Sequence, residues 1–140
     1  MNVKIIEAKL ESLRRCIVRI EEKTPNSVAD LEQNLDAQDV IVLNLSRAIQ
    51  TAVDIASHIV SENDFPAPVT MKQVFDSLQK QGIITEQLAT KMKSAVGFRN
   101  IAVHQYDNLN LEIVYAICTK RLNDFKCYAI EITKILDNTK

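Results

Sequence analysis

The sequence predicts an all-α fold, an antiparallel bundle of four long helices with one or two short helices added. Two glycines and three prolines in 140 residues are far below the roughly 12% that average usage supplies, so few tight turns are available for a β-fold. Apolar residues recur at helical spacing, and no stretch alternates apolar and polar residues as a half-buried strand does. A chain of this length fits one domain, so we expect residues 1–140 to form a single helical domain.

A first helix is predicted from Val3 to the break at residues 24–27. Its apolar residues follow steps of three and four, the heptad pattern of a narrow bundle seam. They are Val3, Ile6, Leu10, Leu13, Ile17 and Ile20. The break reads Thr-Pro-Asn-Ser and contains N-cap residues, so a short helix from Val28 to Leu35 is expected next.

The longest helix is predicted to begin beyond Asp36 and to end before Pro66 and Pro68, which cannot continue it. Two adjoining apolar stripes give it a wide apolar face, as expected for the central helix of a bundle. One stripe contains Ile41, Leu45, Ala48, Ala52, Ile55 and Ile59.

Two further helices are predicted between the prolines and residue 107. A brief helix at 71–81 has Thr70 as its N-cap and ends at Gly82, the residue best suited to a left-handed helix terminus. Thr85 caps the next helix, which is expected to run through residues 86–106 with one apolar side facing inward.

The chain is expected to close with one long helix that begins at Leu111. The residues before it, 107–110, read Asp-Asn-Leu-Asn and break the preceding helix. The helix carries two adjoining apolar stripes, and the polar residues 137–140 form a short tail. No segment is left for a strand.

Charge and cysteine content place the chain among reduced, cytoplasmic proteins. The net charge is -1 and the sequence pI is about 6.1, so any site for a polyanion must be a local patch. Three widely spaced cysteines indicate small buried apolar residues in a reducing compartment; they are Cys16, Cys118 and Cys127. No uncharged apolar run approaches ~18 residues, so we expect no membrane association.

Chemically active side chains gather between Arg99 and Asp107. These nine residues hold a guanidinium, an amide, an imidazole, a phenol and a carboxylate. Asn100 and His104 are four residues apart, so on a helix they can form a hydrogen bond. Arg99 and His104 are five apart and project about 140° from each other. Either the helix loosens near His104, or the two groups work across an interface with a second copy.

The segment from Arg99 to Tyr106 resembles the motif of the HepT toxins of the HEPN superfamily, in which Arg, four residues, His, one residue and Tyr follow one another. The chain length, the heptad first helix, the central helix with Asp54 to Ile59 and the closing helix occur in the family's order. The resemblance therefore implies a helical, homodimeric domain, with no cofactor.

In function, the resemblance implies a metal-independent endoribonuclease toxin of a type VII-like toxin–antitoxin pair, with Arg99 and His104 in a cleft shared by two copies. Imidazole can take the proton of the RNA 2′-hydroxyl or protonate the leaving oxygen, because its ordinary pKa of about 6.5 is near working pH. Arg99 offers a fork of donors to the phosphate. Asn100 is expected to orient His104 or to contact phosphate.

The resemblance gives Tyr106 a separate role. The partner antitoxin is implied to be a nucleotidyltransferase of the MntA type that silences the toxin by transferring AMP to this phenol. Added bulk and negative charge would then repel the RNA phosphate. Without modification, Tyr106 is expected to stack on a base or to bond to phosphate.

Several other polar residues have two interpretations. Asp39 and Arg47 line the cleft, or Asp39 is a first-turn residue stabilised by the helix dipole and Arg47 its surface partner. His58, four residues after Asp54, is more typical of a core histidine held by a carboxylate than of a catalytic one. A local basic rim for RNA is expected from lysines on both sides of Gly82, namely Lys72, Lys80, Lys91 and Lys93.

The rival interpretation of the whole chain is a non-catalytic helical module that binds a nucleotidyltransferase. Arg99, Asn100 and His104 would then form an ordinary solvated helix end. The two functions share one fold, so fold alone does not separate them. No metal-ligand spacing, phosphate loop or pair of catalytic carboxylates is present in the sequence.

Overall fold

The computed structural model describes residues 2–139, and all regular structure in this range is helical, as predicted. The elements in chain order are α1 (Val3–Lys23), α2 (Val28–Glu32), α3 (Leu35–Glu62), α4 (Gln73–Lys80), α5 (Glu86–His104), the 3-10 turn η1 (Tyr106–Asn108), α6 (Leu111–Lys120) and α7 (Leu122–Thr139).

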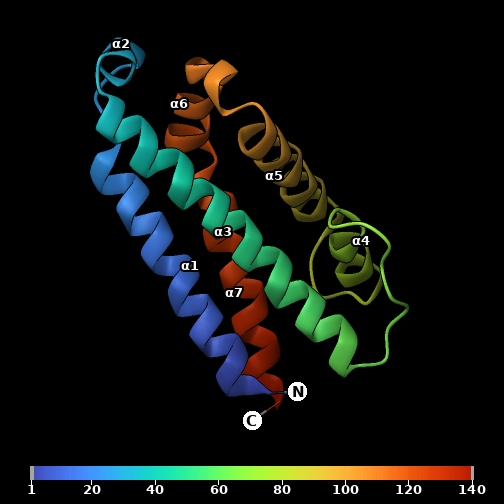
Figure 1. Ribbon diagram of the computed structural model, residues 1–140. Coiled ribbons are helices and arrows are strands. Elements are labelled where there is room, and N and C mark those ends of the chain that lie inside the picture. The colour runs from blue at the N-terminus through green and yellow to red at the C-terminus, as the bar shows by residue number, and fades with distance from the viewer. Residues whose placement is uncertain (1, 140) are drawn as a thin grey trace.

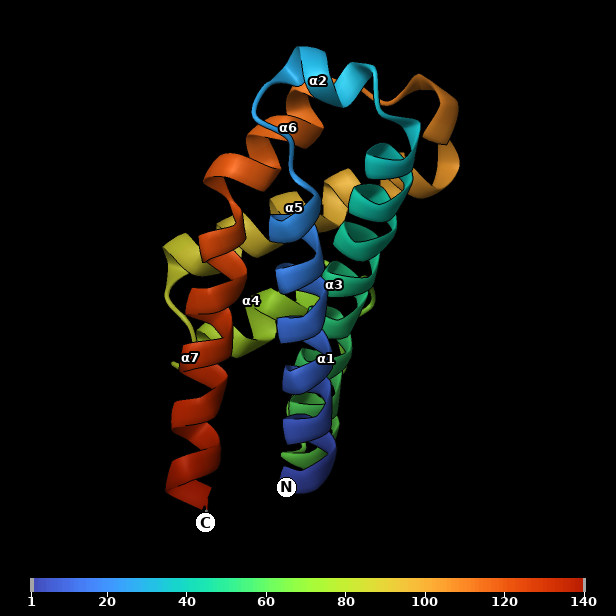
Figure 2. The same cartoon turned by 90° about the vertical axis from the view of Figure 1, so that its left-hand side faces the viewer.

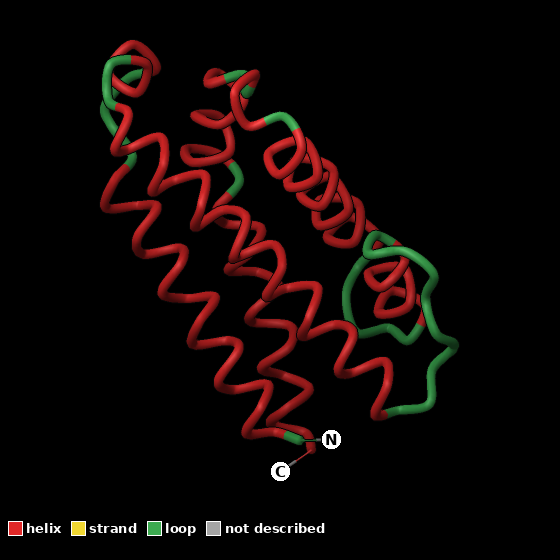
Figure 3. The backbone as a smooth tube through the Cα atoms, in the orientation of Figure 1, coloured by secondary structure: helices red, strands yellow, loops and turns green. Residues whose placement is uncertain are grey.

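The long helices form an antiparallel bundle (Figure 1). α1 and α3 lie side by side along most of their length, and α7 returns beside α1 so that both termini lie at the same end (Figure 2). α5 packs against α3 and α7, while the short α4 fills the space between α3 and α5. The longest loop joins α3 to α4 (Figure 3).

Side-chain caps start most of the helices. Asn2, Ser27, Asn34, Thr85 and Asn110 each accept a hydrogen bond from a backbone N–H in the first turn of the helix that follows. Such caps satisfy donors that have no partner within the helix. The predicted cap at Thr85 is therefore confirmed.

The predicted brief helix lies where expected but is shorter. The hydroxyl oxygen of Thr70 accepts a hydrogen bond of 3.2 Å from the N–H of Gln73, where α4 begins. Gly82 has a φ of +74° just after α4, as predicted for a left-handed terminus.

The core consists of the predicted stripes. The heptad residues of α1 are buried at Ile6, Leu13, Ile17 and Ile20. α3 is buried along both of its apolar stripes, because α1, α4, α5 and α2 all pack on it.

Tyr128 of α7 connects three helices at the centre of the bundle. Its side chain is fully buried, its hydroxyl donates a 2.8 Å hydrogen bond to the carbonyl of Ala52 on α3, and its ring meets that of Phe75 on α4 edge to face at 5.8 Å. Buried phenols need such a partner. The contact holds α7 and α4 to the central helix.

The prediction of one closing helix was wrong, because the chain breaks at Arg121 and forms α6 and α7. No proline or glycine marks the junction, and the apolar spacing continues through it. Packing decides the break, since α6 packs against α2 whereas α7 packs against α1 and α5. The preceding helix also ends earlier than predicted, at His104.

The cysteine prediction was correct for two residues of three. Cys16 and Cys118 are free and buried, and burial raises the pKa of the Cys118 thiol to about 11. Cys127 is exposed, because it lies on the outer side of α7 between the buried Phe125 and Tyr128.

By length and composition, α3 is long and apolar enough to cross a membrane. Its most apolar 18-residue window has a mean hydropathy of 1.2, and 56% of that window is buried within the bundle. A helix at the centre of a bundle core has the same properties.

Candidate active site

The C-terminal half of α5 carries three of the predicted residues. The helix remains regular up to His104 and is closed by the N–H of Gln105, which donates to the carbonyl of Ile101 at 2.8 Å. The helix therefore does not loosen before His104. Arg99 and His104 remain on different sides of one helix, about 140° apart.

Arg99 points inward and its side chain is partly buried. Its Nη1 lies 3.9 Å from the thioether sulfur of Met71, in the α3–α4 loop, and its Nε is buried without a hydrogen-bond partner among the described residues. No carboxylate in residues 2–139 forms an ion pair with it. A thioether is only a weak acceptor, so the charge of this guanidinium is not compensated.

Lys72 brings a second positive charge to the same stretch of α5. Gly97 has no side chain, and the position that a Cβ would take there is 3.5 Å from Nζ of Lys72. No ion pair of Lys72 is present in the described part of the chain. Two cations that share no anion raise the local positive potential, which favours binding of an external anion.

The other lysines of the expected rim are arranged differently. Lys93 pairs with Asp76 at 2.7 Å, and Lys91 pairs with Asp124 at 3.7 Å. Their charges are thus compensated within the chain. Of the predicted rim, Lys72 is the lysine that the structure places next to the helix of Arg99.

His104 and Asn100 are both exposed on α5. The hydrogen bond that their spacing allows is not formed, and neither side chain has a hydrogen-bond partner within residues 2–139. Both groups are therefore open to a ligand. His104 is the last residue of α5.

Tyr106 and Asp39 form a pair that the spacing of the sequence did not reveal. The phenol of Tyr106, in η1, donates a hydrogen bond to Oδ1 of Asp39 in the second turn of α3, although the two residues are 67 positions apart. Tyr106 is 44% exposed. Partial burial is the main cause that raises its pKa to about 12, followed by the hydrogen bond and the charge of Asp39 and then the charge of Asp107.

Arg47 does not join this group. It lines a separate hollow of about 580 Å³ between α1 and α3, together with Arg15 and Arg19. Asp39 is thus the member of the predicted Asp39 and Arg47 pair that the structure brings to Tyr106.

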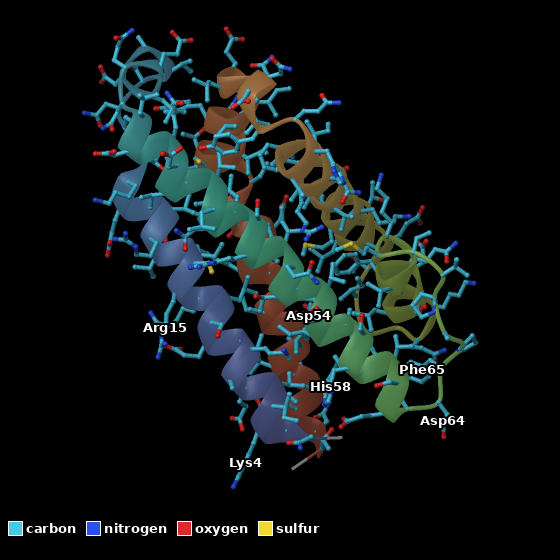
Figure 4. The ribbon with its side chains drawn as sticks, in the orientation of Figure 1. Lys4, Arg15, Asp54, His58, Asp64 and Phe65 are labelled. Atoms are coloured by element: carbon cyan, nitrogen blue, oxygen red, sulfur yellow. The ribbon has the colours of Figure 1, made fainter. Side chains whose placement is uncertain are left out.

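His58 is held by a carboxylate, as predicted, but the partner is Glu62 rather than Asp54. Nε2 of His58 lies 3.0 Å from Oε1 of Glu62, close enough for an ion pair but at an angle that forms no hydrogen bond. Asp54 accepts a 2.9 Å hydrogen bond from Gln50 instead. Asp54 and His58 lie on the lower half of α3, away from the end of α5 (Figure 4).

A second hollow, of about 600 Å³, lies against α5. It is lined mainly by α5, α6 and α7 and includes Phe98, Ile113 and Ile117. No group of three or more His, Cys, Asp or Glu side chains in the described range is arranged to hold a metal ion.

Comparison of the sequence with known proteins finds a ribonuclease family and two relatives that are nucleases. The family described as "Ribonuclease HepT-like" matches residues 13–132. The "mRNA nuclease HepT" of Shewanella oneidensis is 35% identical over 130 residues, which cover 93% of this chain and 96% of that protein. The "tRNA nuclease HepT" of Aphanizomenon flos-aquae is 28% identical over 132 residues, which cover 94% and 90%.

Solved structures with the same fold include toxin–antitoxin complexes. The tri-AMPylated Shewanella oneidensis HEPN toxin in complex with MNT antitoxin has a TM-score of 0.88 and 35% identity, and the match covers 96% of this chain and 99% of that one. A toxin–antitoxin crystal structure with AMP-PNP has the same TM-score and 34% identity, covering 94% and 98%. By sequence and by fold, the chain belongs to the ribonuclease HepT-like family.

Proposed function

We propose that this chain is a metal-independent endoribonuclease, the toxin of a toxin–antitoxin pair, and that its homodimer cleaves RNA with Arg99 and His104. The observation that carries the proposal is the uncompensated guanidinium of Arg99 on the helix that ends with the exposed His104. No carboxylate in the described part of the chain pairs with Arg99, and an RNA phosphate is the anion that neutralises its charge.

Arg99 forms the phosphate site, and Lys72, which lies against Gly97 about 160° around α5 from Arg99, adds positive potential along the same helix. Arg99 donates from a planar fork to the non-bridging oxygens, and Lys72 adds a point charge. Both stabilise the extra negative charge of the transition state, where removal of one donor typically costs 10²–10³ in rate. The exposed amide of Asn100 is close enough in sequence to contact the same strand.

His104 performs the proton transfers. In the first half of the reaction one imidazole removes the proton of the 2′-hydroxyl, whose oxygen then attacks phosphorus. The bond from phosphorus to the 5′-oxygen breaks, and a second imidazole protonates that oxygen. Two copies of His104, one from each subunit, supply the base and the acid.

A second copy of the chain also explains how Arg99 and His104 can act on one phosphate although they point in different directions from α5. Because Arg99 and His104 diverge on one helix, the histidine of one copy reaches the phosphate held by the arginine of the other, and in a two-fold cleft both imidazoles face the same scissile phosphate. Ile101 and Val103 flank this region and are 53% and 52% exposed, which gives the end of α5 an apolar surface for a second copy.

The partner of this toxin is an MntA-type nucleotidyltransferase that transfers AMP to Tyr106. A relative with 35% identity is described as tri-AMPylated and in complex with its MNT antitoxin. Tyr106 is exposed and lies two residues after His104. AMP at this position brings a phosphate charge and a nucleoside into the path of the RNA, so like-charge repulsion and occlusion block cleavage.

The first test is RNA cleavage in EDTA by the purified chain and its variants. His104→Ala and Arg99→Ala are each expected to lower the rate by about 10²–10⁴, because they remove a proton carrier and a charge donor. Lys4→Ala is the control, since Lys4 lies at the other end of the bundle (Figure 4). Circular dichroism checks that each variant is folded.

Three outcomes each contradict one part of the proposal. Equal, background cleavage by all four proteins favours the non-catalytic module that only binds a nucleotidyltransferase. Cleavage that EDTA abolishes and Mg²⁺ restores removes the metal-independent mechanism. Light scattering that gives a monomer of 15.8 kDa at micromolar concentration contradicts the shared cleft.

A further inference from the structure

The hydrogen bond between Tyr106 and Asp39 connects the turn after α5 to the start of α3. No other side chain of η1 forms a hydrogen bond to α3 in the described residues. Both partners are exposed. A bound protein can therefore reach the phenol while Asp39 still holds it.

We infer that Asp39 is the group that orients Tyr106 and accepts its proton when AMP is transferred to it. The inference rests on the proposed modification of Tyr106 and assigns a chemical role to a second residue of the toxin itself. The antitoxin then supplies the nucleotide, while the toxin supplies both the nucleophile and the base.

The transfer step balances as follows. Oη of Tyr106 forms a bond to the α-phosphorus of a nucleoside triphosphate held by the nucleotidyltransferase, and the bond from that phosphorus to the β-phosphate oxygen breaks. Pyrophosphate leaves with the electron pair. The phenolic proton passes to Oδ1 of Asp39, which already accepts its hydrogen bond, and from there to water.

A base is needed because the phenol alone is a weak nucleophile here. With a pKa of about 12, only about one molecule in 10⁵ carries a phenolate at pH 7. As the bond to phosphorus forms, the phenol becomes acidic and a neighbouring carboxylate can remove the proton. An aspartate plays this part for substrate hydroxyls in protein kinases.

The geometry also separates this chemical role from a purely structural one. Asp39→Asn keeps an oxygen that accepts the hydrogen bond from Tyr106, but an amide cannot take the proton. Asp36→Asn is the matched control. Asp36 is exposed in the first turn of the same helix, and it does not bond to Tyr106, whose partner is Asp39. Its replacement by Asn changes the net charge by the same amount as Asp39→Asn.

The experiment follows intact mass over time after the toxin is mixed with its nucleotidyltransferase, ATP and Mg²⁺. Asp39→Asn is expected to lower the rate of the first AMP addition by about 10²–10⁴, and Asp36→Asn to leave it unchanged. Between pH 7 and 9 the Asp39→Asn rate rises about tenfold per pH unit, because the reaction then depends on phenolate. The unmodified chain shows a nearly flat profile.

An Asp39→Asn protein that accepts AMP at the normal rate, with the normal pH profile, overturns the role of Asp39 while the proposed function stands. A loss of equal size in Asp36→Asn also overturns it, since bulk charge would then explain the effect. If the normal chain gains no mass, or still gains it as Tyr106→Phe, the proposed modification itself fails and this inference fails with it.

Discussion

Charges are paired along the α1–α7 side of the bundle and left unpaired at the end of α5. Glu21 of α1 and Lys126 of α7 lie 3.1 Å apart. By contrast, Arg99 and His104 of α5, with the neighbouring Lys72, form no ion pair within residues 2–139. Paired charges are satisfied by the fold itself, whereas unpaired cations favour an external anion. The comparison separates a side that maintains the bundle from the end proposed to bind RNA.

Apolar side chains are buried in the core of the bundle but exposed at the end of α5. Substitutions that test this difference are expected to give the largest effect, on stability. Ile55 at the centre of α3 is fully buried, whereas Ile101 of α5 is 53% exposed. We expect Ile55→Ala to lower the free energy of unfolding by about 2–5 kcal/mol, because it leaves a cavity in the core. Ile101→Ala is expected to change it by about 0.5 kcal/mol or less.

Urea denaturation at 25 °C measures both values. Losses of equal size for Ile55→Ala and Ile101→Ala would contradict the division between core and binding end. They would also indicate that Ile101 is buried in solution, for example against a second copy, which the concentration dependence of unfolding would reveal.

The unpaired cations give the next effect, on RNA affinity. Lys72→Ala is expected to reduce the slope of log K against log salt by about 0.7, the value for one phosphate contact to a single strand. Lys80→Ala, at the other end of α4, is the control. The probe is a 2′-O-methyl RNA, which lacks the attacking hydroxyl and is not cleaved. An unchanged slope for Lys72→Ala removes Lys72 from the RNA contacts.

The ion pairs on the surface of α1 are expected to give the smallest effect, a change in stability that depends on pH. The hydrogen bond from Arg14 is the main cause that lowers the pKa of Glu11 from 4.5 to about 2, with the charges of Arg14 and Arg15 adding to it. Since the pKa is lower in the folded chain, the stabilisation is present above pH 4.5 and is lost as the pH falls toward 2. The side chains are exposed, so the effect is small.

Thermal melts of Glu11→Gln and the unmodified chain measure this difference. The unmodified chain is expected to melt slightly higher at pH 7, and the difference is expected to shrink as the pH falls from 4.5 toward 2, where Glu11 begins to be protonated in the folded chain. High salt should reduce the difference, because surface ion pairs are screened. A difference that does not change with pH would mean that the ion pairs do not cause it.

Much of the fold could be predicted, because local rules decide it. The heptad residues of α1, the cap at Thr85 and the left-handed Gly82 each depend on neighbours a few positions away. The break at Arg121 could not, because nothing in the spacing changes there and only the different packing of α6 and α7 produces it.

The candidate site residues could be named from the sequence, but their arrangement could not. Arg99, His104 and Tyr106 are close together in sequence, so a motif could identify them. The bond from Tyr106 to Asp39 and the approach of Lys72 to Gly97 join segments far apart in the chain. Such contacts depend on how the helices pack, and no periodicity encodes them.

The α3–α4 loop places Met71 beside Arg99 and Lys72 against Gly97 of the same helix, although it forms little of the core. Loops tolerate replacement and insertion far better than packed helices do. If the proposed function holds, substitutions in this loop are expected to change RNA affinity without weakening the fold. Relatives that differ here are expected to vary in substrate preference while they keep the same helical frame.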